Sequence, residues 1–262
     1  MESNSGNKRE KLKNELHLTK NNNNFKLILL AFTIVIFFEI SSCKSKESTK
    51  RSNCKPNIVL ILSDDMGYSD IAPYGGEINT PNLSDLAKNG IKFTQFYNAA
   101  RCCPTRASLL TGTYPHEAGI GHMMGNYGIS QYQGKLSYNV ITIPEVLKKA
   151  GYSTIMSGKW HLTKNDLDQW PLKRGFDNFY GLISGAANYF KSEYPGLIFE
   201  GNEKLNIDDE NYYTTDAFTD KAIEYIDKVK SENSEKPFFL YLSYNAPHWP
   251  LQAPKENIDK YR

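Results

Sequence analysis

The sequence predicts an α/β fold with a mixed, largely parallel central sheet flanked by helices. Apolar, strand-like runs alternate along the chain with segments of helical period. The first run, residues 57–62, is continuous and β-branched, which is typical of a strand buried on both faces. Three of these runs are followed by ionisable side chains. Because parallel strands bring their carboxyl ends to one edge of a sheet, these side chains are expected to converge on a site.

The N-terminal region, residues 1–42, predicts export. A polar, lysine-bearing lead precedes an apolar segment from Leu27 to Phe38, which is too short to span a bilayer but has the length of a signal-peptide core. The following Ile40-Ser41-Ser42-Cys43 resembles the lipobox of bacterial lipoproteins, whose cysteine is lipidated. An ordinary cleaved signal and an uncleaved anchor are the alternatives, and all three export the chain. We expect a membrane-anchored lipoprotein, held on the periplasmic or cell-surface side through lipidated Cys43.

A linker and one domain are expected after this segment. Residues 43–55 are rich in Lys, Ser, Glu and Arg without an apolar period, so they are interpreted as a solvated linker. Residues 56–262 hold all the periodic segments. The formal net charge is +2, and the excess of basic residues lies in residues 1–42. The domain itself is balanced in charge, with no basic patch that would favour nucleic acid as a partner.

The predicted elements of the domain follow from caps, turns and apolar spacing. A helix over residues 81–89 is capped by Thr80, has a proline at its first position and ends at Gly90. The other elements, in chain order, are a strand over 91–97, a helix over 143–150, a strand over 152–156, a helix capped at Thr215 and a strand over 237–244.

The stretch from Arg101 to Gly112 places a thiol, a proline and an arginine close together. Pro104 suits the first turn of a helix, and Gly112 suits the position just past its end. Cys102 would then lie at the helix N-terminus, where backbone donors and the helix dipole favour an anion. Arg106, one turn further on, points back toward that end. The pattern indicates a reactive sulfur, or a group made from it, facing an anionic group.

The ionisable residues after the three strands complete the candidate site; they are Asp64, Asp65, Lys159, His161 and His248. Each has a simpler interpretation by itself, because adjacent aspartates often form a turn, and a single histidine is often a packed surface residue. Their shared position after strands favours a common site. Trp170, Asn188 and Tyr189 could line a pocket, but core packing is the better interpretation for the aromatic residues.

Several segments together resemble type I sulfatases of the alkaline phosphatase superfamily. Cys102-Cys103-Pro104-Thr105-Arg106 fits the Cys-x-Pro-x-Arg signature of that family, and Leu109-Leu110-Thr111-Gly112 continues it. Three more matches follow the family's N-terminal half in order: Asn57–Asp65, Gly158-Lys159-Trp160-His161 and Ala246-Pro247-His248. The resemblance covers residues 56–262, so these are expected to be the N-terminal part of a sulfatase catalytic domain.

This resemblance implies a sulfuric ester hydrolase, arylsulfatase-like, that acts on sulfated small molecules or carbohydrates. It implies that a maturation enzyme converts Cys102 to formylglycine, whose hydrated aldehyde attacks sulfur with one hydroxyl and expels sulfate through the other. Asp64, Asp65 and the modified Cys102 would bind one Ca²⁺, a cation that prefers oxygen ligands. Such a metal would acidify the nucleophile and polarise a sulfate oxygen.

The same resemblance assigns the remaining roles. Arg106 would steady the nucleophile, and Lys159 would neutralise the sulfate. His161 would accept the proton that triggers expulsion of sulfate, and His248 would donate a proton to the leaving alcohol. Each such acid–base role typically contributes about 10²–10⁴-fold in rate.

Alternatives stay open because type I sulfatases are longer, and their second half supplies further ligands for the metal and the sulfate. Asp64 and Asp65 provide at most about four of the six to eight oxygens that calcium takes. The chain is therefore expected to be part of a longer active enzyme, with an unfinished sheet whose edge strand is exposed. The alternatives are a membrane-tethered, non-catalytic remnant and a phosphate or phosphonate ester hydrolase of the same superfamily, since both ester types present a tetrahedral anion.

Overall fold

The computed structural model describes residues 55–164, 166–193 and 196–262. The predicted signal peptide (1–42), Cys43 and the predicted linker up to residue 54 lie outside the described residues. Within the described ranges, no helix combines the length and the apolar character needed to cross a bilayer.

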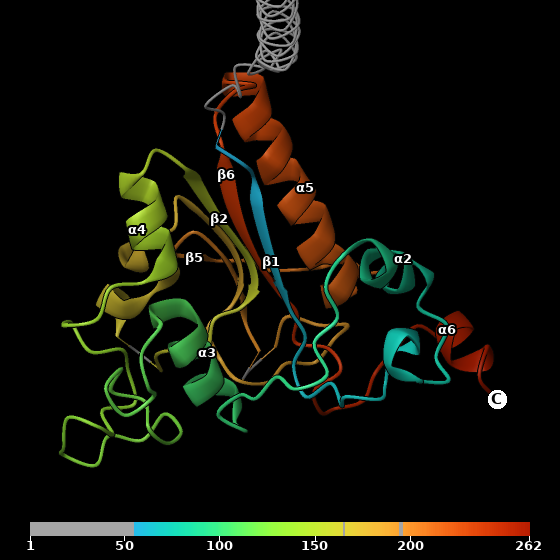
Figure 1. Ribbon diagram of the computed structural model, residues 1–262, viewed down its shortest axis with the longest axis horizontal. Coiled ribbons are helices and arrows are strands. Elements are labelled where there is room, and N and C mark those ends of the chain that lie inside the picture. Colours follow the sequence, from blue (N-terminus) through green and yellow to red (C-terminus); the bar gives the residue numbers. More distant parts are fainter. Residues whose placement is uncertain (1–54, 165, 194–195) are drawn as a thin grey trace, which may run out of the picture. The chain divides into compact units, whose positions relative to one another are not determined.

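A mixed, six-stranded sheet forms the centre of the fold (Figure 1). Its strands are β1 (Ile58–Leu62), β2 (Ser153–Lys159), β3 (Asn178–Leu182), β4 (Ile198–Glu200), β5 (Glu203–Lys204) and β6 (Phe238–Ser243). They lie in the order β1-β6-β2-β3-β4-β5. The ladders joining β1, β6, β2 and β3 are parallel, and those of β3 with β4 and β4 with β5 are antiparallel. The predicted class, a largely parallel sheet flanked by helices, is confirmed.

Helices cover both faces of this sheet (Figure 1). The described helices are α2 (Pro81–Asn89), α3 (Cys102–Thr111), α4 (Ile143–Lys149), α5 (Thr214–Glu232) and α6 (Lys255–Asp259), with 3₁₀ turns η1 (Ala72–Tyr74), η2 (Leu167–Gln169) and η3 (Pro171–Arg174). Helices α2 and α6 bury no residue and lie beside the sheet (Figure 1). Helix α5 packs on β2, β3 and β6, whereas α3 and α4 pack on the opposite face. Each face therefore has its own apolar core.

Strand β6 shows how the two cores are built from one segment. Successive side chains of a strand point to opposite faces. Phe239 and Tyr241 accordingly pack in the core beneath α3 and α4, whereas Leu240 and Leu242 pack in the core beneath α5. All of β6 is buried, which confirms the strand predicted over 237–244.

The prolines and glycines mark helix ends as predicted, but two predicted caps do not form. The Thr80 hydroxyl accepts from the Ala72 N–H instead of capping α2, and α5 begins at Thr214 without a side-chain cap.

Helix α3 begins at Cys102, and Gly112 ends it with a left-handed φ of 69° while its N–H donates to the Ser108 carbonyl at 2.8 Å. Helix α4 begins with a capping box, in which the Thr142 hydroxyl accepts from the Glu145 N–H and the Glu145 carboxylate accepts from the Thr142 N–H. Both devices satisfy backbone groups that have no partner inside the helix.

Strand β2 runs further than the sequence predicted, through Gly158 to Lys159. Gly158 has a φ of 115°, and a Cβ placed there would lie 1.9 Å from the Ser243 carbonyl oxygen of β6. No side chain fits that space, so glycine is required where the two strands approach each other. Lys159 is the last residue of β2, and its backbone pairs with Leu182 of β3.

The structure corrects the prediction that the first strand is buried on both faces. Ile58, Leu60 and Leu62 pack against the core beneath α3 and α4, but Val59 and Ile61 are about half exposed, at 51% and 55%. β1 is an edge strand, and α5 packs on its neighbours rather than on β1. An apolar, β-branched run therefore marked a strand correctly but did not show which of its faces is covered.

The predicted strand over residues 91–97 is wrong. This segment has no regular secondary structure, and Ile91, Phe93, Phe96 and Tyr97 are exposed. A strand requires a neighbouring backbone that accepts and donates its hydrogen bonds. The segment pairs with no strand in the described part of the chain, so its alternating pattern has no ladder to join.

Candidate active site

Three neighbouring strands bring most of the candidate residues together. β1, β6 and β2 are adjacent and parallel, so their carboxyl ends lie at one edge of the sheet. The Asp64 N–H donates to the Ala246 carbonyl at 2.9 Å, which joins the segments that follow β1 and β6. Asp64, Lys159 and His248 thus occupy one region of the molecule, as the strand-end pattern predicts.

Asp64 lies at the centre of a buried ionic cluster. Its Oδ1 is 3.3 Å from Arg106 Nη2, and its Oδ2 accepts from Lys159 Nζ. All three side chains are almost fully buried. Burial lowers the pKa of Lys159, the Arg106 charge lowers it further, and the Asp64 carboxylate acts in the opposite direction. The cluster carries one negative and up to two positive charges, so it favours a further anion.

Arg106 connects α3 to the sheet. Its Nη1 donates to the Lys159 carbonyl at 2.8 Å, to the Tyr241 hydroxyl at 3.3 Å and to the Ser243 hydroxyl. Its Nε and Nη2 find no hydrogen-bond acceptor among the described residues, although Nη2 forms the ion pair with Asp64. The side chain therefore fixes the helix that begins at Cys102 and keeps donors available within the site.

Cys102 lies at the N-terminus of α3, close to Cys103 and His161. The two sulfur atoms and a ring nitrogen of His161 all lie within 4.8 Å of one another. A hydrogen bond from the Cys103 thiol lowers the pKa of Cys102 to about 3, against the effect of partial burial. The same bond and burial raise the pKa of Cys103. The unmodified Cys102 is therefore a thiolate at neutral pH, as a nucleophile or metal ligand requires.

His161 follows β2 and is buried, with a left-handed φ of 52°. Its backbone N–H donates to the Ile183 carbonyl at 3.1 Å, whereas its side-chain Nδ1 has no hydrogen-bond partner among the described residues. Burial lowers the pKa of this imidazole from its ordinary 6.5. The ring is therefore neutral near pH 7 and can accept a proton.

Asp65 and His248 form the exposed part of the site. Asp65 has a left-handed φ of 63°, and its side chain is 61% exposed. The nearer carboxylate oxygen, Oδ2, lies 3.6 Å from His248 Nε2. Tyr189 holds the His248 segment, because its hydroxyl is 2.9 Å from the Asn245 carbonyl and 2.7 Å from the His248 carbonyl. Tyr189 thus has a positioning role that its aromatic character alone did not indicate.

A polar cavity of about 170 Å³ lies between these groups, lined by Asp64, Asp65, Cys102 and Arg106 among others. The two carboxylates suit a hard cation such as Ca²⁺ in kind. They supply only part of its coordination, and both Asp64 oxygens already contact Lys159 and Arg106. The residues therefore fit a calcium ion as partial ligands that would share Asp64 with the two cations.

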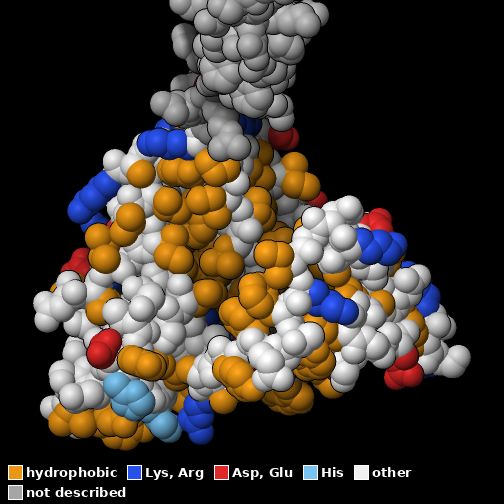
Figure 2. All heavy atoms as spheres, viewed as in Figure 1, with side chains coloured by type: hydrophobic (Ala, Val, Ile, Leu, Met, Phe, Trp, Pro, Cys, Tyr) orange, Lys and Arg blue, Asp and Glu red, His pale blue; other side chains and the backbone are white. Residues whose placement is uncertain are grey.

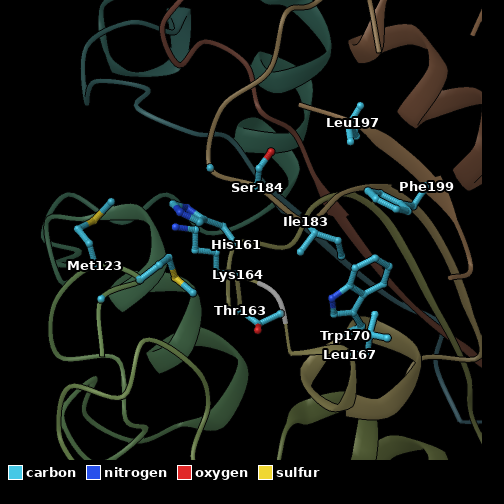
Figure 3. Close-up of a pocket in the computed structure, with 13 residues that line it drawn as sticks. Met123, His161, Thr163, Lys164, Leu167, Trp170, Ile183, Ser184, Leu197 and Phe199 are labelled. Carbon is cyan, nitrogen blue, oxygen red and sulfur yellow. The ribbon is translucent and has the colours of Figure 1, made fainter. Parts of the chain in front are cut away.

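A second cavity, of about 980 Å³, adjoins His161 (Figure 3). Apolar side chains from separate segments line it, including Met123, Trp170 and Phe199. Trp170 also belongs to the apolar core, so the predicted core packing and a pocket position both hold for it. Asn188 lies away from this cavity and donates to Glu193 at the surface. Met123 and Phe199 carried no motif in the sequence, because only the fold brings them beside His161.

The fold and this group of residues define an α/β protein with an anion-favouring site at the carboxyl edge of its sheet. A family model described as Sulfatase matches residues 56–262. The chain belongs to the sulfatase family.

Two curated relatives agree with this assignment. The chain is 41% identical over 228 residues to an uncharacterized sulfatase of Schizosaccharomyces pombe, covering 79% of this chain and 40% of that protein. It is 36% identical over 219 residues to an arylsulfatase of Klebsiella aerogenes, covering 79% of this chain and 46% of the relative. The chain thus spans less than half the length of these relatives.

Solved structures show the same fold. The crystal structure of Ps i-CgsB in complex with k-i-k-neocarrahexaose matches with a TM-score of 0.69 and 35% sequence identity. The match covers 79% of this chain and 48% of the Ps i-CgsB chain. The structure of BT4656 in complex with its substrate D-glucosamine-2-N,6-O-disulfate has a TM-score of 0.59 and 31% identity, covering 74% and 35%. The alkaline-phosphatase-like α/β architecture is therefore shared with sulfatases of known structure.

Proposed function

We propose that the protein hydrolyses sulfate esters and that its substrate is a sulfated carbohydrate. The observation that carries this proposal is the position of Cys102 at the N-terminus of α3, in a small polar cavity that also contains Arg106. Lys159 contacts the Asp64 carboxylate at the same site. A tetrahedral dianion needs positive charge and backbone donors of this kind.

Two groups that are typical of the sulfatase family, a formylglycine and a calcium ion, complete the site in this proposal. Cys102 is converted to formylglycine by a maturation enzyme, and Asp64, Asp65 and the modified residue hold one Ca²⁺. The hydrated aldehyde supplies the nucleophile, and the cation supplies polarisation of sulfate. The carboxylate donors of the cavity support this assignment in kind, and Asp64 and Asp65 would be part of the coordination that Ca²⁺ takes.

The chain's own residues orient the reacting groups and move protons. Arg106 holds α3 against β2 and β6 and directs its remaining donors toward the cavity. Lys159, whose charge is shared with Asp64, neutralises a bound sulfate. His161 is neutral near pH 7, because burial lowers its pKa, and its free Nδ1 accepts a proton from the nucleophile. His248, which is closer to solvent, donates a proton to the leaving alcohol.

The larger cavity beside His161 supports a carbohydrate as the organic part of the substrate. Trp170 and Phe199 line it, and the Trp170 indole N–H has no acceptor among the described residues. Aromatic faces with free polar groups suit sugar rings, which combine apolar faces with hydroxyl groups. Both solved relatives described above were determined with a saccharide bound.

An exported location is part of the same proposal. The signal-peptide pattern of residues 1–42 and the lipobox-like Cys43 support a lipoprotein anchored on the periplasmic or cell-surface side of a membrane. A polymeric sulfated carbohydrate is accessible there. Detergent-phase partitioning of the expressed protein, lost in Cys43→Ala, tests the anchor.

Hydrolysis of sulfate esters by the protein, co-expressed with a formylglycine-generating enzyme and supplied with Ca²⁺, tests the proposed activity. The substrates are a fluorogenic aryl sulfate and sulfated oligosaccharides, each paired with the corresponding phosphate ester. Mass spectrometry of the Cys102 peptide measures conversion. We expect hydrolysis of sulfate esters, a loss of at least about 1,000-fold in Cys102→Ala, and no loss in the matched control Cys54→Ala.

Three results would overturn the proposal. Hydrolysis by the Cys102→Ala protein would exclude the nucleophile, and faster hydrolysis of the phosphate esters would exclude the substrate class. A folded, fully converted protein that hydrolyses no sulfate ester would exclude the proposed activity.

A further inference from the structure

The cluster formed by Cys102, Cys103 and His161 has a second property that sulfate ester hydrolysis does not use. As translated, it offers two thiol sulfurs and one imidazole nitrogen, all within 4.8 Å of one another. The Cys103 sulfur also lies 3.6 Å from the thioether sulfur of Met123. The segment that carries Met123 lies far from Cys102 in the sequence, so the fold assembles three sulfur atoms and one nitrogen.

The cluster is buried and has unused coordinating capacity. Cys103 has no exposed surface, and beside Cys102 its thiol makes long contacts with the Met123 sulfur at 3.6 Å and the His122 carbonyl at 3.7 Å. His161 is 7% exposed, and its Nδ1 has no hydrogen-bond partner among the described residues. A buried ring nitrogen without a partner is unfavourable unless something binds it.

The ligand types select a soft cation. Thiolate sulfur selects soft cations such as monovalent copper and zinc, and the additional thioether sulfur of Met123 favours copper, whereas calcium takes oxygen. We propose that, before Cys102 is converted to formylglycine, the chain binds one Cu⁺ ion through Cys102, Cys103 and His161, with Met123 as a weak fourth ligand. The oxygen donors Asp64 and Asp65 take no part in this site.

The geometry requires little rearrangement. Metal–ligand bonds of about 2.3 Å to sulfur and about 2.0 Å to nitrogen place tetrahedral ligand atoms about 3.5–3.8 Å apart. The two sulfurs and the ring nitrogen are at most 4.8 Å apart, so side-chain rotations that shorten these distances by about 1 Å bring the ligand atoms to bonding positions. Figure 3 shows Met123 and His161 on the same side of the pocket that both residues line.

Charge and proton balance also agree with a copper ion. Both sulfurs bind the metal as thiolates, and any proton still on either sulfur passes to solvent when the metal binds. Two thiolates and one Cu⁺ carry one net negative charge, and the neighbouring Lys159 ammonium and Arg106 guanidinium offset it. The ion keeps its oxidation state, so no oxidant or reductant is needed.

This inference is independent of the proposed hydrolysis, because it concerns the thiol form of Cys102. Its consequence is competition. A copper ion bound to the Cys102 sulfur covers the atom that conversion to formylglycine must replace. Once Cys102 has been converted, the site has lost one of its two thiolates.

Anaerobic titration with Cu⁺ tests the site. The protein is the 262-residue chain expressed without a maturation enzyme, with Cys43→Ser and Cys54→Ser in every variant so that only Cys102 and Cys103 remain. A chromophoric Cu⁺ chelator competes for the metal. We expect one bound equivalent, and a loss of affinity in Cys103→Ser and Cys102→Ser greater than the roughly 10- to 100-fold that removal of an outer-shell partner costs.

The methionines provide a matched pair for this titration. Met123→Leu is expected to weaken binding by about tenfold, whereas Met124→Leu, at the adjacent position, is expected to leave it unchanged. Circular dichroism checks that each variant is folded. A wild-type affinity in both cysteine variants would overturn the site, and tighter binding of Zn²⁺ than of Cu⁺ would overturn the choice of cation.

Alkylation of the parent protein, which has all four coordinating side chains, gives a second measurement that does not depend on the cysteine variants. Cu⁺ is expected to slow carbamidomethylation of the Cys102 peptide, followed by mass spectrometry, and Ca²⁺ at the same concentration is expected to have no effect. An unchanged rate with one equivalent of Cu⁺ bound would place the metal elsewhere and contradict the proposal.

Discussion

Strands β1 and β2 lie on either side of β6, and both lead into residues of the candidate site, yet they differ in burial. Every residue of β2 is buried, whereas in β1 only alternate residues approach a core. Hydrophobic side chains gather on the surface where β1 lies (Figure 2). The difference teaches that one half of the site rests on a sheet covered from both sides, and the other half on an edge strand.

The residues that follow the two strands repeat this contrast. Lys159, at the end of β2, is fully buried, and it pairs with Asp64, which is also buried. Asp65, one residue further from β1, is mostly exposed. Substitutions at the two aspartates and in the two strands should therefore differ strongly in their effect on stability.

Asp64→Ala is expected to have the largest effect on stability. Removing this carboxylate leaves Lys159 and Arg106 as neighbouring buried cations without a counter-ion. Breaking a buried ion pair in this way lowers the free energy of unfolding by about 3–5 kcal/mol. Urea denaturation at pH 7 measures it.

The adjacent Asp65→Ala is the matched control for this measurement. Its exposed carboxylate is expected to contribute less than about 0.5 kcal/mol to stability. Equal losses in the two variants would contradict the division of the site into a buried half and an exposed half.

The next largest effect is expected in the strands themselves. Ile155 of β2 is fully buried, so Ile155→Ala should lower the free energy of unfolding by about 2–5 kcal/mol through lost burial and a cavity. Ile61→Ala in β1 removes the same atoms from a half-exposed position and should cost less than about 1 kcal/mol. Thermal and urea unfolding of both variants gives the comparison; a cost for Ile61→Ala as large as that for Ile155→Ala would show that β1 is covered in solution.

The smallest effect on stability, with a separate effect on solubility, is expected for Ile61→Lys. A lysine on an exposed edge strand opposes pairing with another chain and removes apolar surface. The free energy of unfolding should change by less than about 1 kcal/mol, while the concentration at which light scattering detects aggregates should rise. Val59→Lys should behave in the same way, and a fall in solubility for either variant would argue against β1 as an aggregation-prone edge.

Local signals predicted much of the fold. Prolines near the helix starts and glycines after the helices placed α2 and α3, apolar spacing placed α4, and the apolar runs placed β1, β2 and β6. Tertiary context decided the rest. Residues 91–97 alternate as a strand would but have no partner in the described structure. β3 contains Asn178 and Gly181, which strands disfavour, and β4 and β5 carry too few residues for a clear period. Which face of β1 is covered depends on the position of α5, far away in the sequence.

The candidate site could be predicted as a set of residues but not as a network. Strand ends and the Cys102 motif indicated which side chains meet. The ion pairs of Asp64 with Lys159 and Arg106, and the contact of Cys103 with Met123, join residues that are distant in the chain. No local pattern records such pairs, because they arise only when separate strands and loops pack together.

Arg106 has a consequence for the motion of Cys102. One guanidinium group joins the second turn of α3 to the Lys159 carbonyl of β2 and to the side chains of Tyr241 and Ser243 on β6. A displacement of α3 along or away from the sheet must break these bonds together in a buried environment. Cys102 is therefore tied through α3 to β2 and β6, whereas among the described residues the exposed Asp65 carboxylate has no such tie to the sheet.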